Sequence, residues 1–161
     1  MILIGIDPGL ARVGYGLLSK NGNDTRHITH GCITTRATDE HSTGARLDKI
    51  YRELQEIIKE YRPEQAAVEK LFFSKNITSA MGVAEVRGII LLLCEQEGIG
   101  VTEYTPNQVK QAITGSGKAD KAQMQDMIRR LLHLEEIPRP DDAADGLSIA
   151  LCHANTMRGS R

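Results

Sequence analysis

The sequence predicts an α/β fold, and three observations support this prediction. The first 35 residues contain three runs rich in apolar and β-branched residues, separated by turn residues. Two shorter runs of the same kind then alternate with segments in which apolar residues recur at helical spacing. Beyond Thr105, only helical patterns remain. A sheet of five strands covered by helices accounts for all three observations.

The first strand is predicted over residues 2–7 and ends at an acidic residue. Its apolar run, ILIGI, is typical of a central strand covered on both faces, and Pro8 and Gly9 end it with turn residues. Asp7 is therefore the last residue of the strand. On this stretch alone, Asp7 is equally well interpreted as a turn-capping acid that accepts hydrogen bonds from nearby amides.

Two more strands and a helix follow. Residues 13–18 are close enough to the first strand for a hairpin, and residues 27–35 have the β-branched character of a third antiparallel strand. After a polar loop, apolar residues recur at helical spacing from Gly44 to Arg62, with charges of both signs on the remaining face. This is the pattern of an ordinary solvated helix, and it indicates no function.

A second acid stands at the end of the fourth strand. Residues 65–68 form a short apolar strand that ends on Glu69. Ligands gather at the carboxyl ends of parallel strands, so Asp7 and Glu69 would meet at one edge of the sheet if their strands are parallel neighbours. A glutamate that simply faces water is the alternative.

The next helix, over residues 76–96, is predicted to begin with Asn76 as N-cap and to be closed by Gly98. Its second half, residues 89–94, is apolar on every face. Such a helix lies in the core or against another molecule. We expect a homodimer, and burial of the helix within one subunit is the alternative.

The fifth strand, residues 101–104, leads into a short helix with a clear start signal. Thr105 is the predicted N-cap and Pro106 the first helical residue, and this helix carries Lys110. A glycine-rich loop at residues 115–119 comes next.

A capping box opens the following helix and places a lysine at its start. Asp120 is the predicted N-cap and Gln123 its partner, so Lys121 lies in the first turn, where the helix dipole disfavours a cation. A phosphate bound there would explain the placement. Residues 105–133 carry five lysines and arginines against two acids, which indicates a polyanionic partner. A solvated basic helix is the alternative.

The last helix begins with the acidic stretch PDDAAD at residues 140–145. Asp142 and Asp145 are three residues apart and lie on one helix face, and Asp141 is the expected N-cap. The apolar residues around this turn indicate that it is packed inside, where neighbouring carboxylates raise each other's pKa unless a cation is present. Acids that merely complement the helix dipole are the alternative.

Composition bounds the remaining possibilities. With 161 residues and 40% hydrophobic content, we expect one domain over residues 1–155 and a short mobile tail at 156–161. We find no signal sequence, lipidation motif or apolar span of 18 residues, which predicts a soluble, cytoplasmic protein without membrane contact. Cys32, Cys94 and Cys152 have no C-x-x-C spacing, and we expect reduced thiols instead of a zinc site.

Together, these motifs resemble the RuvC family of Holliday-junction resolvases over nearly the whole chain. The motifs are GIDPG at residues 5–9, GYG at 14–16, Glu69 with Leu71 and Phe72, VKQ at 109–111, the glycine-rich loop that leads to Lys121, and DAAD at 142–145. The resemblance implies the RNase H-like fold of that family, which is a five-stranded mixed sheet flanked by helices and assembled as a dimer.

By position, the resemblance places the family's four metal-binding acids on Asp7, Glu69, Asp142 and Asp145. Helical spacing alone would also allow Asp141 to pair with Asp145. Oxygen ligands suit Mg²⁺ or Mn²⁺ and argue against zinc. The resemblance implies two Mg²⁺ ions in each active site, with Mn²⁺ as a substitute.

The resemblance also implies which residues contact DNA. Lys121 would face the scissile phosphate and stabilise the charge of the transition state, with Lys110 in a similar or supporting role. Phe72 matches the aromatic residue that stacks on a base near the crossover. Lys118 is expected to contact the DNA backbone at most.

The implied function is that of a metal-dependent endodeoxyribonuclease, a hydrolase of homologous recombination and DNA repair. A two-fold dimer would make paired symmetric nicks in a four-way junction by two-metal-ion hydrolysis. The products would carry ligatable 5′-phosphate and 3′-hydroxyl ends. The RuvA–RuvB branch-migration complex is implied as a partner.

Three other functions have discriminating features. An RNase H-like nuclease that acts on another nucleic acid, such as an RNA–DNA hybrid, would share the acidic site, and a substrate panel separates the two. An actin-like kinase, which GIDPG also resembles, needs a second nucleotide-binding lobe for which the chain is too short. A non-catalytic junction-binding module would have the acids replaced, and all four acids are present.

Overall fold

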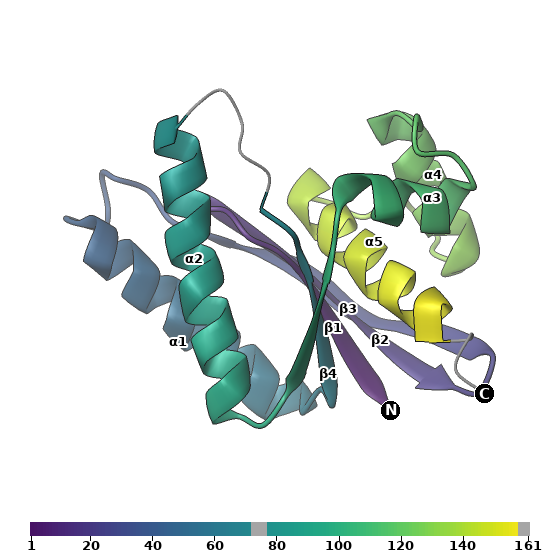
Figure 1. The fold of residues 1–161 in the computed structure, drawn as a ribbon, viewed down its shortest axis with the longest axis horizontal. Coiled ribbons are helices and arrows are strands. Elements are labelled where there is room, and N and C mark those ends of the chain that lie inside the picture. Colours follow the sequence, from purple (N-terminus) through teal and green to yellow (C-terminus); the bar gives the residue numbers. More distant parts are fainter. Residues whose placement is uncertain (72–76, 158–161) are drawn as a thin grey trace.

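The computed structural model describes residues 1–71 and 77–157, which form five strands and five helices. The strands are β1 (Ile2–Asp7), β2 (Arg12–Asn21), β3 (Asp24–Thr34), β4 (Gln65–Glu69) and β5 (Gly100–Tyr104), and the helices are α1 (Thr43–Tyr61), α2 (Ile77–Gln96), α3 (Pro106–Thr114), α4 (Lys121–Leu131) and α5 (Asp141–Thr156). The sheet is the middle layer, with α1 and α2 on one face and α3, α4 and α5 on the other (Figure 1).

The strands form one mixed sheet in the order β3-β2-β1-β4-β5. β2 is antiparallel to both β1 and β3, whereas β4 is parallel to both β1 and β5. The predicted five-stranded mixed sheet is therefore confirmed. Because Ile6 of β1 is paired with Val68 of β4, the next residues, Asp7 and Glu69, end neighbouring parallel strands at the same edge of the sheet.

β1 is buried on both faces, as its continuous apolar run predicts. Leu3 and Ile4 are both fully buried but belong to different cores because successive side chains of a strand point to opposite faces. Ile4 packs in the core under α1 and α2 with Ile90, and Leu3 packs in the core under α3, α4 and α5 with Leu147.

Glycines let α5 lie directly on β1 and β2. A Cβ at Gly14 would overlap the backbone carbonyl of Asp142, and a Cβ at Gly5 would overlap that of Gly146. Only residues without a side chain permit such an approach. The first turns of α5, which carry the acidic stretch, are thereby brought to the end of the sheet where β1 stops.

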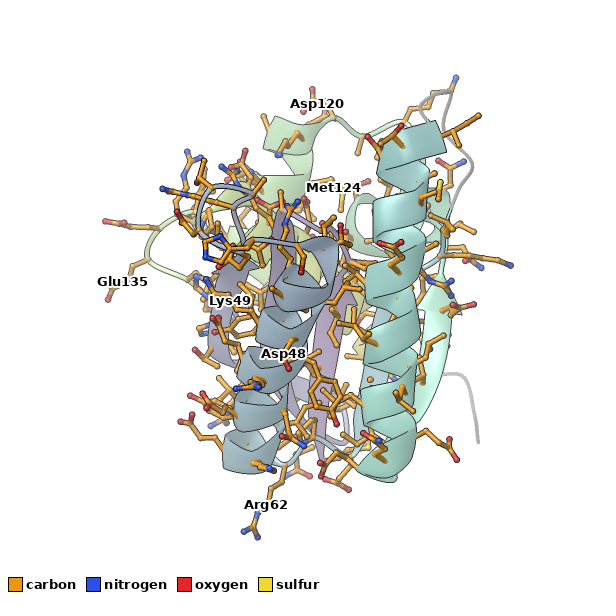
Figure 2. The ribbon with its side chains drawn as sticks, turned by 90° about the vertical axis from the view of Figure 1, so that its left-hand side faces the viewer. Asp48, Lys49, Arg62, Asp120, Met124 and Glu135 are labelled. Atoms are coloured by element: carbon orange, nitrogen blue, oxygen red, sulfur yellow. The ribbon has the colours of Figure 1, made fainter. Side chains whose placement is uncertain are left out.

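The outer face of α1 is solvated, as its charge pattern predicts. Asp48 and Arg52 form an ion pair of 3.0 Å one turn apart, and Figure 2 shows the Asp48 side chain on the outside of the helix. In the same view Arg62, which caps the end of α1, and Asp120, which caps the start of α4, lie at opposite ends of the molecule.

The start signals of α3 and α4 are confirmed, and that of α5 is wrong. Thr105 and Asp120 each open a capping box, as predicted. Asp141, the predicted N-cap of α5, is instead its first helical residue; Pro140 precedes it, and no side chain caps the helix. The Asp141 carboxylate is bound instead by the side chains of Lys121, Gln125 and Arg139.

α2 corrects the expectation that no apolar span of 18 residues occurs. Its 20 residues include a window of mean hydropathy 1.7, long and apolar enough to cross a membrane by length and composition alone, a test that core helices of soluble proteins also pass. Val86 and Ile90 pack in the core, while Met81 and Leu92 are 59% and 52% exposed. One side of α2 therefore packs in the core, and another side exposes an apolar stripe that includes Met81 and Leu92.

Some predictions concern residues beyond the described ranges. The predicted N-cap Asn76 lies outside them, and so do residues 158–161 of the predicted tail. Thr156 is the last residue of α5, so the helix reaches one residue further than the predicted domain. The three cysteines are free, as expected.

Candidate active site

Two carboxylates meet where β1 and β4 end. The side chains of Asp7 and Glu69 are hydrogen-bonded to each other. Burial, followed by the charges of Glu69 and Asp145, raises the pKa of Asp7 to about 8. Burial also raises the pKa of Glu69, and the hydrogen bond from Asp7 opposes that shift. The pair of carboxyls therefore holds a proton to a higher pH than a separate carboxyl would.

α5 brings a third acid to the same place. Asp145 lines a cavity of about 260 Å³ together with Asp7 and Glu69. Burial raises the pKa of Asp145, while the charge of Lys121 lowers it and that of Asp142 raises it. We call Asp7, Glu69 and Asp145 the cavity acids. Three elements far apart in the sequence thus place desolvated carboxylates around one space.

Two of the three predicted lysines line this cavity. Lys110 reaches it from α3 and Lys121 from the first turn of α4. Lys118 is exposed on the loop between these helices and lines different hollows of the surface. The structure therefore separates two lysines that face the acids from one that lies apart from them.

Asp142 is turned toward a cation of the protein. Its Oδ2 lies 3.5 Å from Nη1 of Arg12, at the start of β2. The lining of the cavity, as far as the described residues show it, leaves Asp142 out. Its charge nevertheless raises the pKa of both Asp7 and Asp145. Of the four predicted metal-binding acids, three share one cavity and the fourth is paired with Arg12 close by.

Asp141, next to Asp142, is bound by three side chains. Its Oδ2 lies 3.0 Å from Nζ of Lys121, and its Oδ1 accepts hydrogen bonds of 3.0 Å from both Gln125 and Arg139. The hydrogen bond between Asp141 and Lys121 lowers the pKa of the acid and raises the pKa of the lysine. We call Asp141 and Asp142 the helix-start acids.

The cavity acids have the chemistry of a hard-metal site, although they are not yet gathered around one point. Within the part of the chain that the structure describes, no three His, Cys, Asp or Glu side chains are grouped so that they could hold a metal ion. Carboxylate oxygens are the ligands that Mg²⁺ and Mn²⁺ favour. A cation would also stabilise the ionised forms of these acids, which burial and the neighbouring charges disfavour. The chemistry of these donors therefore suits such an ion.

The sequence analysis missed the partners of the helix-start acids. Arg12, Gln125 and Arg139 belong to no recognised motif, and their contacts join distant parts of the chain. The only signal for Arg12 is its place between the first two glycine motifs.

Phe72, the predicted base-stacking residue, lies outside the described residues, so its role stays a prediction. Leu71, the last residue before that gap, lines a second hollow of about 230 Å³. Glu69 lines this hollow as well as the cavity, so Leu71 lies close to one of the cavity acids.

Comparisons with known proteins agree on one family. A family model described as Crossover junction endodeoxyribonuclease RuvC matches residues 3–153. The protein of that name from Pseudothermotoga lettingae is 52% identical over 153 residues, which cover 95% of this chain and 93% of the relative. The one from Rubrobacter xylanophilus is 50% identical over 159 residues, which cover 99% of this chain and 88% of the relative.

Solved structures give the same result. T. thermophilus RuvC in complex with Holliday junction substrate has a TM-score of 0.91 at 35% identity, with 98% of this chain and 95% of that chain covered. The yeast mitochondrial Holliday junction resolvase has a TM-score of 0.70 at 14% identity, with 95% and 77% covered, and shares the fold. The predicted RNase H-like fold is confirmed.

Proposed function

This chain belongs to the RuvC family of crossover junction endodeoxyribonucleases, and we propose on that premise that the cavity acids form the centre at which it cuts DNA. The chain is a nuclease that resolves Holliday junctions, as its family, its relatives and a junction-bound structural neighbour indicate. The observation that supports the site is the burial of three carboxylates from β1, β4 and α5 in one cavity beside two lysines.

Nucleases of this family depend on metal ions, and our proposal for the ion is Mg²⁺, with Mn²⁺ as a substitute. Asp7, Glu69 and Asp145 would hold it, together with Asp142 once the contact of Asp142 with Arg12 opens. If two such ions were bound, they would supply an activated water and stabilise the leaving 3′-oxygen. The proton that the Asp7–Glu69 pair holds has to leave before both carboxylates can bind a cation.

Lys121 is the cation best placed to meet the scissile phosphate. It lines the cavity, and an ammonium group has three N–H donors, of which Asp141 takes one. A donor at this position stabilises the charge that builds on the phosphate oxygens during displacement. Lys110 would add a second positive charge from α3, and Lys118 would contact only the DNA backbone outside the cavity.

A homodimer would set two such sites on one junction. The exposed apolar stripe of α2, which includes Met81 and Leu92, offers a surface that a second copy would bury. Two-fold symmetry presents identical sites to strands of like polarity. The nicks would then be paired and symmetric, and would leave 5′-phosphate and 3′-hydroxyl ends that can be ligated.

The wider setting is also part of the proposal. We expect residues 1–155 to act as one nuclease domain and the RuvA–RuvB complex to be the partner that delivers the junction. The family consists of soluble enzymes that act on DNA, and we place this member in the cytoplasm.

Cleavage of a synthetic four-way junction tests the site. The junction, a linear duplex and an RNA–DNA hybrid are incubated with the protein in Mg²⁺, and the products are mapped at nucleotide resolution. We expect paired nicks on the junction alone. Asp145→Asn should reduce the cleavage rate by more than about 100-fold and should still bind the junction. Loss of a residue that only hydrogen-bonds to a metal ligand already lowers activity by about 10–100-fold. A junction that is bound but uncut in both Mg²⁺ and Mn²⁺, or cleavage of the hybrid instead, would contradict the proposal.

A further inference from the structure

The contacts of Asp141 give this residue a part in the reaction that the four metal-binding acids do not cover. We propose that Asp141 is a positioning residue, which holds the ammonium group of Lys121 at the mouth of the cavity before DNA binds. The inference rests on the proposed function, because it takes Lys121 as the group that meets the scissile phosphate.

Asp141 is itself held in a fixed orientation. Nε2 of Gln125 and Nη1 of Arg139 both donate to Oδ1 at 3.0 Å. Gln125 is only 9% exposed, so packing fixes its amide. With two donors on Oδ1, the other oxygen is directed at Lys121, 3.0 Å away. This arrangement differs from that of a surface acid that pairs with a passing lysine.

Lys121 needs such a partner because little else holds it. Its four-carbon stem is flexible, and 58% of the side chain is exposed, so packing does not fix the ammonium group. The cavity acids beside it carry negative charge that attracts the same group. By binding Lys121 from the side, Asp141 keeps the lysine near the cavity and away from the oxygens that a metal ion requires.

The contact leaves Lys121 free to act on the substrate. Two of the three N–H donors remain available for phosphate oxygens, and a donor already in place needs no reorganisation as charge develops. Loss of the Asp141 charge should therefore slow cleavage. Junction affinity should change little, because it is spread over many phosphate contacts.

The test uses Asp141→Asn in the full chain, which keeps the size of the side chain and removes its charge. Single-turnover cleavage of a four-way junction in Mg²⁺ gives the rate of the chemical step, and junction binding in Ca²⁺ gives the affinity. We expect the rate to fall about 10-fold, as for other partners of reacting groups, and the affinity to change by less than about 2-fold.

A double-mutant cycle separates positioning from general damage to the fold. If Asp141 acts through Lys121, Asp141→Asn should have no further effect in the Lys121→Ala background. Asp141→Glu retains the charge and should recover part of the rate. Asp126→Asn is the matched control: it removes an acid of α4 that is paired with Arg129 and Arg130, and it should leave the rate unchanged.

The outcomes distinguish this role from the proposed function. An unchanged or faster rate in Asp141→Asn, with the wild-type protein active, would overturn the positioning role alone. An equal loss in the Lys121→Ala background would overturn it as well, because the effect would then not pass through the lysine. A wild-type protein that leaves the junction uncut would overturn both.

Discussion

The cavity acids and the helix-start acids lie close together but differ in their electrostatic environment. Asp7, Glu69 and Asp145 are desolvated, their pKa values are raised, and Asp7 and Glu69 are hydrogen-bonded to each other. Asp141 and Asp142 are instead each paired with a cation of the protein itself.

This difference agrees with the proposal that the cavity acids bind an external cation. Buried carboxylates without a cation cost free energy, and such groups cluster at functional sites. Two cations close to the cavity acids, Arg12 and Lys121, are each paired with a helix-start acid. These contacts keep the protein's own positive charges from filling the space between the cavity acids.

The largest effect should come from Asp7→Asn. Cleavage of the junction should fall by more than about 100-fold, because a ligand of the proposed metal is lost. Above about pH 8, where Asp7 is ionised, the metal-free protein should become more stable, because a buried repulsive charge is removed. Single-turnover cleavage and thermal unfolding in EDTA measure the two effects.

Asp48→Asn is the control for this substitution, since Asp48 forms an ion pair with Arg52 on the surface of α1. It should leave the cleavage rate unchanged and alter stability by less than about 1 kcal/mol. If the Asp7→Asn variant still cut at half the wild-type rate, the proposal that the cavity acids bind the metal required for cleavage would be contradicted.

The next effect in size should be on the stability of the metal-free protein. The pKa of Asp7 is about 8 in the folded chain against a usual 3.8, so the native state keeps a proton that the unfolded chain releases. The contribution of Asp7 is therefore present at low pH and is lost as pH rises from about 4 to about 8. Melting curves in EDTA across this range should show a fall in stability that Asp7→Asn reduces.

Mg²⁺ should reverse that loss. At 100 times its Kd, a bound ion adds about 2.7 kcal/mol to the free energy of unfolding, or about 5–10 °C in Tm. At one fixed Mg²⁺ concentration the gain should be larger at pH 8 than at pH 6, since the ion and the proton compete for the same carboxylates. A gain that is independent of pH would show that the ion binds elsewhere.

The smallest effect should come from Arg12→Gln. The Arg12 side chain is 62% exposed and lies 3.5 Å from Asp142, so the pair contributes at most about 1 kcal/mol to stability. Released from Arg12, Asp142 should raise the affinity for Mg²⁺ by about 2–3-fold, which is under 1 kcal/mol. Calorimetric titration measures this change, and weaker binding would show that Arg12 does not hold Asp142 back.

The secondary structure was predictable because each element has a local signal. The apolar run before Asp7 and the capping boxes at Thr105 and Asp120 act over a few residues. The prediction that Asp141 is the N-cap of α5 was wrong. The position of Asp141 after Pro140 favours an N-cap, but a lysine and a glutamine of α4 compete successfully for its carboxylate.

The sequence by itself predicted the succession of strands and helices along the chain and, through the family resemblance, suggested which acids and lysines form the proposed active site. Only the tertiary structure decided which of these acids share a desolvated cavity and which are paired with a cation. Asp142 and Arg12, for example, are 130 residues apart. Propensities and caps depend on neighbours along the chain, whereas burial and ion pairing depend on segments that only the folded sheet and its helices bring together.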